Sequence, residues 1–257
     1  MKITCLILTF NEQDRIRIAL TPAMKWADEV VVVDKGSSDN TRDIAEGVGA
    51  KVCTIPFSRQ GHESLSDMAA CAANDWVWHF TPGEVPTKKL IELGKTLVSD
   101  SVDLIMVPMY YYSFGLHHDK SPWAGGWQPR LYNRKRVTFT GNAHDPIRAE
   151  RKYRIPCLHG QHILHQTHPT AQDFMRTHAD YMVNEAAQGT PKESFDRATK
   201  AHGAFDGAFL GDQTLTPHML AWKLYWLGVA LHAWERAQDD IPKQYQERAT
   251  AALEEWA

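Results

Sequence analysis

The chain has 257 residues, of which 43% are hydrophobic and 23% are charged, and its formal net charge is −3. This length suits one large α/β domain, or one domain with an appendage, and the composition is that of an ordinary globular protein. The small negative charge excludes a global basic field that would draw the protein to nucleic acid or to a membrane surface. Because no uninterrupted apolar run reaches about 18 residues, we expect no stable membrane insertion and a cytoplasmic location.

The first 112 residues alternate between short apolar runs and longer amphipathic runs. This alternation predicts βαβ units and a mostly parallel sheet flanked by helices. We predict strands at 3–9, 29–34, 51–55, 76–80 and 104–112. We predict helices at 12–26, 39–48, 61–73 and 86–98, and Pro22 should break or kink the first of them.

The character of the sequence changes after residue 113, where aromatic, glycine and histidine residues dominate. Two short strands are predicted near 128–133 and 147–155. From Thr170 onward the pattern is helical, and helices are predicted at 170–189, 215–237 and 242–256. We therefore expect an α/β domain at 1–168 and a helical C-terminal extension at 169–257, whose aromatic helices would suit a homodimer face.

The four cysteines have no CxxC spacing and lie mostly in apolar runs. We expect buried free thiols, as in a reducing compartment, and no zinc site. These residues are Cys5, Cys53, Cys71 and Cys157.

Polar residues follow three of the predicted strands, at 9–12 (TFNE), 34–39 (DKGSSD) and 81–84 (TPGE). Each cluster alone is more simply explained as a helix cap or a strand end. The carboxyl ends of parallel strands, however, meet at one edge of an open sheet, where ligands bind. The three clusters together, in this order, therefore favour a functional site.

These clusters carry a resemblance to a known family. Residues 8–12 and 26–41 resemble the nucleotide-binding half of family 2 glycosyltransferases with the Rossmann-like GT-A fold. The resemblance implies an inverting transfer of a sugar, such as a hexose, from a nucleotide diphosphate donor of the UDP-sugar kind to a hydroxyl group of a glycan. Further segments resemble the subgroup that contains lipopolysaccharide-core glucosyltransferases, at 130–134, 139–145, 163–165 and 205–207.

The resemblance also assigns site residues. The first loop would line the nucleoside pocket, Asp34 would accept a hydrogen bond from the uracil or the ribose, and the turn after it would flank the nucleotide. If no metal offsets the phosphate charges, arginines suit this role, and Arg59, Arg130, Arg134 and Arg136 are the available cations. Together these assignments give as donor-binding residues Thr9, Phe10, Asn11, Glu12, Asp34, Ser37, Asp39, Thr81, Arg130 and Arg134.

An inverting transfer needs a carboxylate that deprotonates the acceptor hydroxyl. Asp145, which follows His144 in the family's His-acid position, is the candidate general base, and Glu84 is its rival. A turn role for Asp145 before Pro146 is an equally open interpretation.

The metal site departs from the family pattern. Two aspartates that hold a divalent metal against the diphosphate in the family are replaced by Thr81 and Gly83. Glu84 alone is a poor site for magnesium. We therefore assign no metal ligand, although Mg²⁺ or Mn²⁺ is usual in the family. A metal held by Glu84 with His144 or His165 is the alternative.

Two other functions stay open at this point. Basic residues gather between 130 and 154 among aromatic residues, which would suit a hydroxylated base in DNA as the acceptor. The loss of both aspartates would also suit a non-catalytic protein that keeps the fold and binds a nucleotide. Metal-free transfer activity would separate an enzyme from such a protein.

Overall fold

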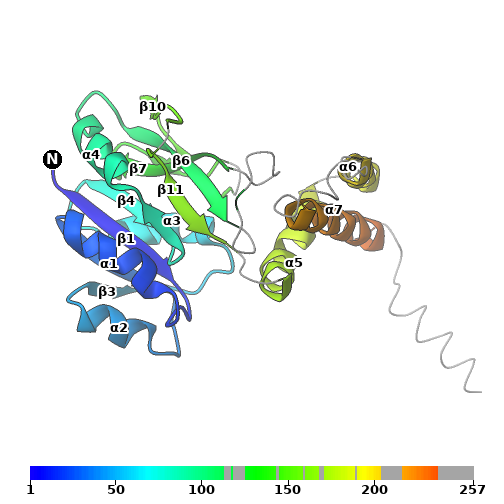
Figure 1. Ribbon diagram of the computed structural model, residues 1–257, viewed down its shortest axis with the longest axis horizontal. Helices are drawn as coiled ribbons and strands as arrows, with labels where there is room; N and C mark the ends of the chain where they lie inside the picture. The colour runs from blue at the N-terminus through cyan, green and yellow to red at the C-terminus, as the bar shows by residue number, and fades with distance from the viewer. Residues whose placement is uncertain are drawn as a thin grey trace, which may run out of the picture. The chain divides into compact units, whose positions relative to one another are not determined.

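The computed structural model describes residues 1–112, 117, 125–142, 145–158, 160–167, 171–188, 190–203 and 216–236. They fall into two compact units, drawn in Figure 1. The first unit comprises residues 1–112 and 125–167, and the second contains the helices that follow residue 168. His144, the predicted helix start at Thr170, the segment 205–207 and the predicted helix at 242–256 lie outside the described residues.

The first unit is built on a sheet that has nine strands within the described residues. Along the sheet the order is β3-β2-β1-β4-β7-β6-β11-β5, and β10 also pairs with β6. The strands are β1 (Ile3–Thr9), β2 (Glu29–Asp34), β3 (Lys51–Thr54), β4 (Trp76–Phe80), β5 (Glu84–Pro86), β6 (Leu104–Tyr112), β7 (Gly125–Asn133), β10 (Lys152–Arg154) and β11 (Ile163–Gln166). A separate small sheet pairs β8 (Thr138–Phe139) with β9 (Ile147–Arg148).

The sheet is mostly parallel, as the sequence predicts. β1 pairs in parallel with both β2 and β4, and β2 pairs in parallel with β3. The antiparallel strand β7 lies between β4 and β6. At the end of the first two strands Thr9 stands opposite Asp34. The carboxyl ends of β1, β2 and β4 therefore meet at one edge, as expected.

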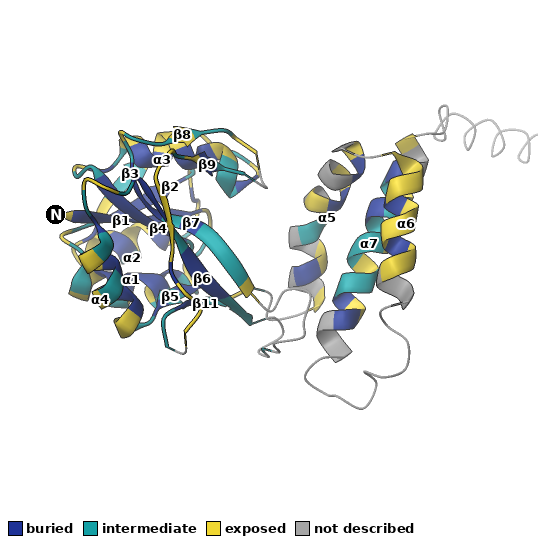
Figure 2. Ribbon diagram, turned by 90° about the horizontal axis from the view of Figure 1, so that it is seen from above, coloured by how far each residue is buried: buried dark blue, intermediate teal, exposed yellow. Residues whose placement is uncertain are grey.

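Helices cover both faces of this sheet, because alternate side chains of each buried strand face opposite sides. One face of β1 packs with α1 (Ile16–Trp26) and α4 (Lys88–Leu97), and the other packs with α3 (Leu65–Ala70). Figure 2 shows the buried strands between these helices. The short helices α2 (Thr41–Gly47) and η1 (Gly61–Ser64) complete the unit. Pro22 does not end α1, which continues to Trp26.

The cysteines correct the sequence expectation of four free thiols. Cys53 in β3 and Cys71, which caps the end of α3, form a disulfide with their Cα atoms 6.2 Å apart. Their separation of 18 residues gave no signal, because the packing of α3 beside β3 brings them together. Cys5 is buried and free as expected, whereas the free thiol of Cys157 is exposed.

The second unit consists of α5 (Ala171–Gln188), α6 (Pro191–Gly203) and α7 (Thr216–Arg236). Its small core joins Met182 and Ala186 of α5 to Val229 and Ala233 of α7. The helical C-terminal region expected from the sequence is thus confirmed. Among the helices of the described chain, none combines the length and the apolar character needed to cross a membrane.

Candidate functional site

Asp34 organises the turn at the end of β2. The side chain is fully buried, and its Oδ2 accepts hydrogen bonds from the backbone N–H groups of Gly36 (3.1 Å) and Ser37 (2.9 Å). The Ser37 hydroxyl donates to the other oxygen, Oδ1. Gly36 has a φ of +89°, a conformation that glycine adopts without a Cβ penalty. The carboxylate predicted to bind the nucleoside therefore holds the turn together.

The turn after Asp34 is tied to the loop after β1 through Asn11. Its φ of +53° is uncommon for a residue other than glycine. The Asn11 backbone N–H donates to Ser37 Oγ, and the Asn11 side-chain oxygen accepts from the Ser38 N–H, both at 2.8 Å. Glu12 N–H donates to Thr41 Oγ1 at 2.8 Å, and Asp39 accepts from Gln13 N–H at 3.0 Å. The structure thus brings both predicted donor-binding loops into one rigid edge.

An exposed aromatic pair stands beside these loops. Phe10 and Phe57 are 40% and 57% exposed, and their ring centroids lie 4.7 Å apart. The Lys35 ammonium lies 5.4 Å from the Phe57 ring centroid. Partial burial holds the pKa of Lys35 below its ordinary value, and nearby Glu63 opposes that effect. Exposed rings at a ligand edge suit stacking on a base or a sugar.

Glu84 occupies the place where the family's metal site would be. Its side chain is fully buried, and Arg130 Nη2 lies 2.5 Å from its Oε1. Nδ1 of His165 is 3.2 Å from the same oxygen. The other oxygen, Oε2, accepts a hydrogen bond from the Thr81 backbone N–H at 2.9 Å. Both oxygens of this carboxylate are therefore occupied by groups of the chain itself.

A β-bulge places Arg130 at Glu84. Ile105 of β6 pairs with Leu131, but the next residue, Met106, pairs with Pro129, so Arg130 is the extra residue on β7. Such bulges re-aim a side chain and are common beside active sites. The guanidinium of Arg130 is close enough to His79 and His165 to lower the pKa of both, after burial as the larger cause.

Asp145 lies in a hollow of about 210 Å³ beside β7. Arg148 Nε is 2.5 Å from Oδ2 of Asp145, and the Asp145 side chain is 45% exposed. Trp127, Gln128 and Pro129, immediately before Arg130, line the same hollow with Met106, Pro146, Ile147 and Lys152. Neighbouring residues of β7 thus line the hollow of the candidate base and contact Glu84.

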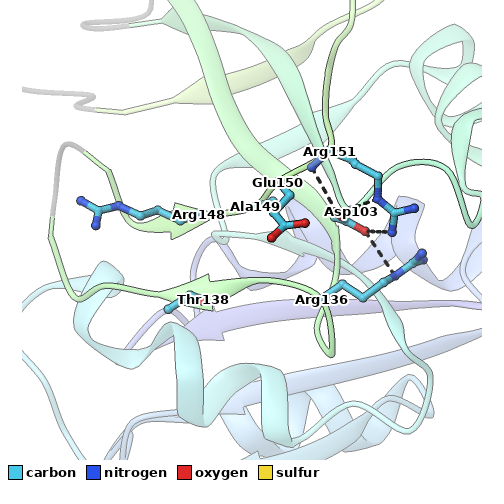
Figure 3. A pocket seen from close by; sticks show the side chains of 7 residues that line it. All are labelled: Asp103, Arg136, Thr138, Arg148, Ala149, Glu150 and Arg151. Atoms are coloured by element: carbon cyan, nitrogen blue, oxygen red, sulfur yellow. Dashed lines mark hydrogen bonds and ion pairs between the residues drawn. The ribbon is translucent and has the colours of Figure 1, made fainter.

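Arg134 is not brought to this edge. Its Nε donates to the Asn74 carbonyl at 3.1 Å, just before β4 begins and so at the amino end of the strands. A larger open hollow, about 510 Å³, lies beside Asp103 at the start of β6. Figure 3 shows Arg136 and Arg151 directed at Asp103, while Arg148 points away. These arginines are engaged in ion pairs, and the hollow lies apart from the predicted donor site.

The described residues around Glu84 do not fit a divalent metal. Within the described part of the chain, no group of three or more His, Cys, Asp or Glu side chains is arranged to hold an ion. A Cβ added to Gly83 would lie 2.5 Å from the Gln166 carbonyl oxygen of β11, so an aspartate here would displace that strand. Glu84 and His165 lie side by side, as the alternative metal site requires, but the Glu84 carboxylate is already paired with Arg130.

Sequence reasoning missed two residues at this edge of the sheet, one beside Gly83 and one beside Phe10. Arg15 lies near Gly83, with Nη1 3.8 Å from the Cβ that an alanine would carry there, and it pairs with Glu12 at 2.8 Å. Its place three residues after Glu12 was the available signal. Phe57 had no signal beyond its position just after the third strand.

Comparisons with known proteins identify the family. Residues 4–156 match the model of the family described as Glycosyl transferase family 2. Uncharacterized glycosyltransferases of Rickettsia bellii and Rickettsia conorii are each 31% identical over 157 residues, or 57% of this chain. That match covers 52% and 54% of those proteins, so the chain spans about half the length of these curated relatives.

Solved structures resemble the chain more distantly. A complex of glucosyl-3-phosphoglycerate synthase from Mycobacterium tuberculosis with Mn²⁺, UDP and glucosyl-3-phosphoglycerate has 18% sequence identity and a TM-score of 0.40. It covers 52% of this chain and 57% of that one. The family match over residues 4–156 spans both donor-binding loops, Glu84 and Asp145. The chain belongs to glycosyl transferase family 2.

Proposed function

We propose that the protein transfers a hexose from a UDP-sugar to a hydroxyl group of a glycan, with inversion at the anomeric carbon. The observation that supports this most is the arrangement along β7. Arg130 reaches Glu84 at the donor edge, and the three residues before Arg130 line the hollow of Asp145. One strand thus carries a cation for the leaving group and residues that line the hollow of the candidate base.

These positions suit a single displacement at the anomeric carbon. Asp145 takes the proton of the acceptor hydroxyl as that oxygen attacks the anomeric carbon of the sugar. The bond from this carbon to the diphosphate oxygen breaks, and UDP leaves with the electron pair. The attack comes from the face opposite the leaving group, so the configuration inverts. Nearby cations stabilise the negative charge that grows on the diphosphate.

A DNA acceptor gains no support from the basic stretch. Arg148 pairs with Asp145, and both Arg136 and Arg151 pair with Asp103. Arg154 stacks on Trp127, with its guanidinium carbon 3.4 Å from the ring centroid. Arginines used in this way are less available for phosphate contacts. We therefore propose a glycan hydroxyl as the acceptor.

The test is transfer from UDP-hexoses to glycan acceptors by the wild type and by Asp145→Asn. The variant should lose roughly 100- to 10,000-fold in kcat, the usual effect of removing a general base. Its affinity for UDP should stay the same, because Asp145 lies in a hollow away from the donor loops.

Glu150→Gln is the matched control, because Glu150 belongs to the same part of the chain but lines the hollow beside Asp103. It should leave kcat unchanged. Near-normal turnover in Asp145→Asn, with a loss in a folded Glu84→Gln, would move the base to Glu84. Binding of UDP without transfer by the wild type to any acceptor tried would favour the non-catalytic alternative.

A further inference from the structure

The Glu84 cluster contains polar atoms that have no partner. Three are buried without a hydrogen bond to any described residue: Thr81 Oγ1, Arg130 Nε and His165 Nδ1. The last of these lies 3.2 Å from Glu84 but is not aligned for a hydrogen bond. Buried polar groups are normally satisfied, so such a concentration at one place indicates a ligand that supplies the missing contacts.

The same cluster gathers nitrogen hydrogen-bond donors from three parts of the chain. Arg130 enters from β7 and His165 from β11, and Arg15 approaches from the start of α1. The positive charges of Arg15 and Arg130 both act on His165 and lower its pKa, with burial as the larger cause and Glu84 opposing. Two arginines and an imidazole thus surround the position from which the family's second aspartate is missing.

The backbone of β11 leaves no room for an acidic side chain at position 83. Gln166 N–H donates to the Gly83 carbonyl at 2.9 Å, so β11 runs directly along the turn. Because glycine has no Cβ, β11 can lie this close to the turn at Gly83. The family's aspartate at this position would clash with the Gln166 carbonyl oxygen. The sequence change from aspartate to glycine therefore removes a metal ligand and admits β11, which carries His165.

We propose that Arg15, Arg130 and His165 bind the diphosphate of the donor directly, in place of a divalent cation. The identity of the nucleotide in this inference rests on the proposed function. The binding of a diphosphate without metal does not. Arginine suits the task because its planar fork donates two hydrogen bonds to a phosphate. Glu84 holds Arg130 in place through Nη2, and the arginine Nε is buried without a hydrogen-bond partner among the described residues.

The test is calorimetric binding of two probes, inorganic pyrophosphate and UDP, to the full chain in EDTA and then with MgCl₂ or MnCl₂. Both probes should bind in EDTA, and added metal should change the dissociation constants by less than about 2-fold. Arg15→Gln should weaken both by about 10-fold or more, as for a lost charged hydrogen bond. Arg17→Gln is the matched control, since Arg17 lies exposed on the same helix, and it should have no effect.

Arg130 needs a gentler change, because its removal would leave Glu84 buried without a partner. Arg130→Lys keeps the charge but loses the fork, so it should weaken binding while the chain stays folded by circular dichroism. His165→Gln should also weaken pyrophosphate binding.

The outcomes separate this inference from the proposed function. UDP binding that requires metal would overturn the inference and leave UDP as the donor nucleotide. Metal-free pyrophosphate binding that depends on Arg15, with no gain from the uridine, would support the inference and remove UDP. Wild-type affinity in Arg15→Gln would overturn the inference.

Discussion

The imidazole of His79 makes the stability of the fold sensitive to acid. It lies in β4 with its ring 5.5 Å from that of Tyr132, and its Nδ1 has no hydrogen-bond partner among the described residues. Burial, with the charge of Arg130, holds its pKa well below the ordinary value. Below a pH of about 6.5 the unfolded chain therefore binds a proton that the folded chain resists, and stability falls as the pH falls.

Urea unfolding of the wild type between pH 8 and pH 5 should show this loss below about pH 6.5, up to about 1.4 kcal/mol per pH unit for one proton. His79→Phe should reduce the dependence, because no group at this position then titrates. His165 contributes with the same sign, so some slope should remain in the variant. An unchanged slope in His79→Phe would contradict the assignment.

At single residues, sequence reasoning predicted where side chains lie more reliably than which contacts they make. The spacing of the polar clusters was enough to bring Asn11, Asp34 and Glu84 to one edge, because strand ends set that position. It could not indicate that the carboxylate oxygens of Asp34 and Glu84 accept hydrogen bonds from groups of the chain itself. Nor could it separate Arg130 from Arg134, since a bulge decides which one reaches Glu84.

Among the secondary-structure elements, the long buried strands were predictable, and the short strands β5 and β11 were not. β1, β2, β4 and β6 lie where continuous apolar runs predict them. β5 has three residues and contains a proline, and β11 has four residues in a histidine-rich stretch. Their pairing joins residues about 80 positions apart, which local periodicity does not record.

The disulfide between β3 and α3 gives a prediction at this scale. The bond closes a loop of 18 residues, and in the chain-entropy account such a loop stabilises the folded state by about 3 kcal/mol. Under non-reducing conditions Cys71→Ala should therefore lower the free energy of unfolding by about 2–4 kcal/mol.

Cys157→Ala is the control, since this cysteine is exposed and free, and its effect should be within about 0.5 kcal/mol. Thiol titration of the denatured wild type should detect Cys5 and Cys157 before reduction and all four cysteines after it. Four reactive thiols without a reductant would show that the bond does not form in solution.

For the whole molecule, the two units differ in the size of their cores. Two large clusters of buried side chains lie on the two faces of the sheet in the first unit. The described core of the second unit consists of four buried residues, Met182, Ala186, Val229 and Ala233. Because stability follows the apolar surface that is buried, the helical unit should melt at the lower temperature.

This difference leads to a calorimetric prediction that also locates the donor site. Scanning calorimetry of the full chain should resolve two transitions, with the helical unit first. UDP in EDTA at about 100 times its dissociation constant should stabilise the first unit by about 2.7 kcal/mol, because ligand binds only its folded form. The second transition should then rise by roughly 5–10 °C, at 2–4 °C per kcal/mol for a domain of this size. A shift of the helical transition alone would place the nucleotide in the second unit and contradict the site built here on β1, β2 and β4.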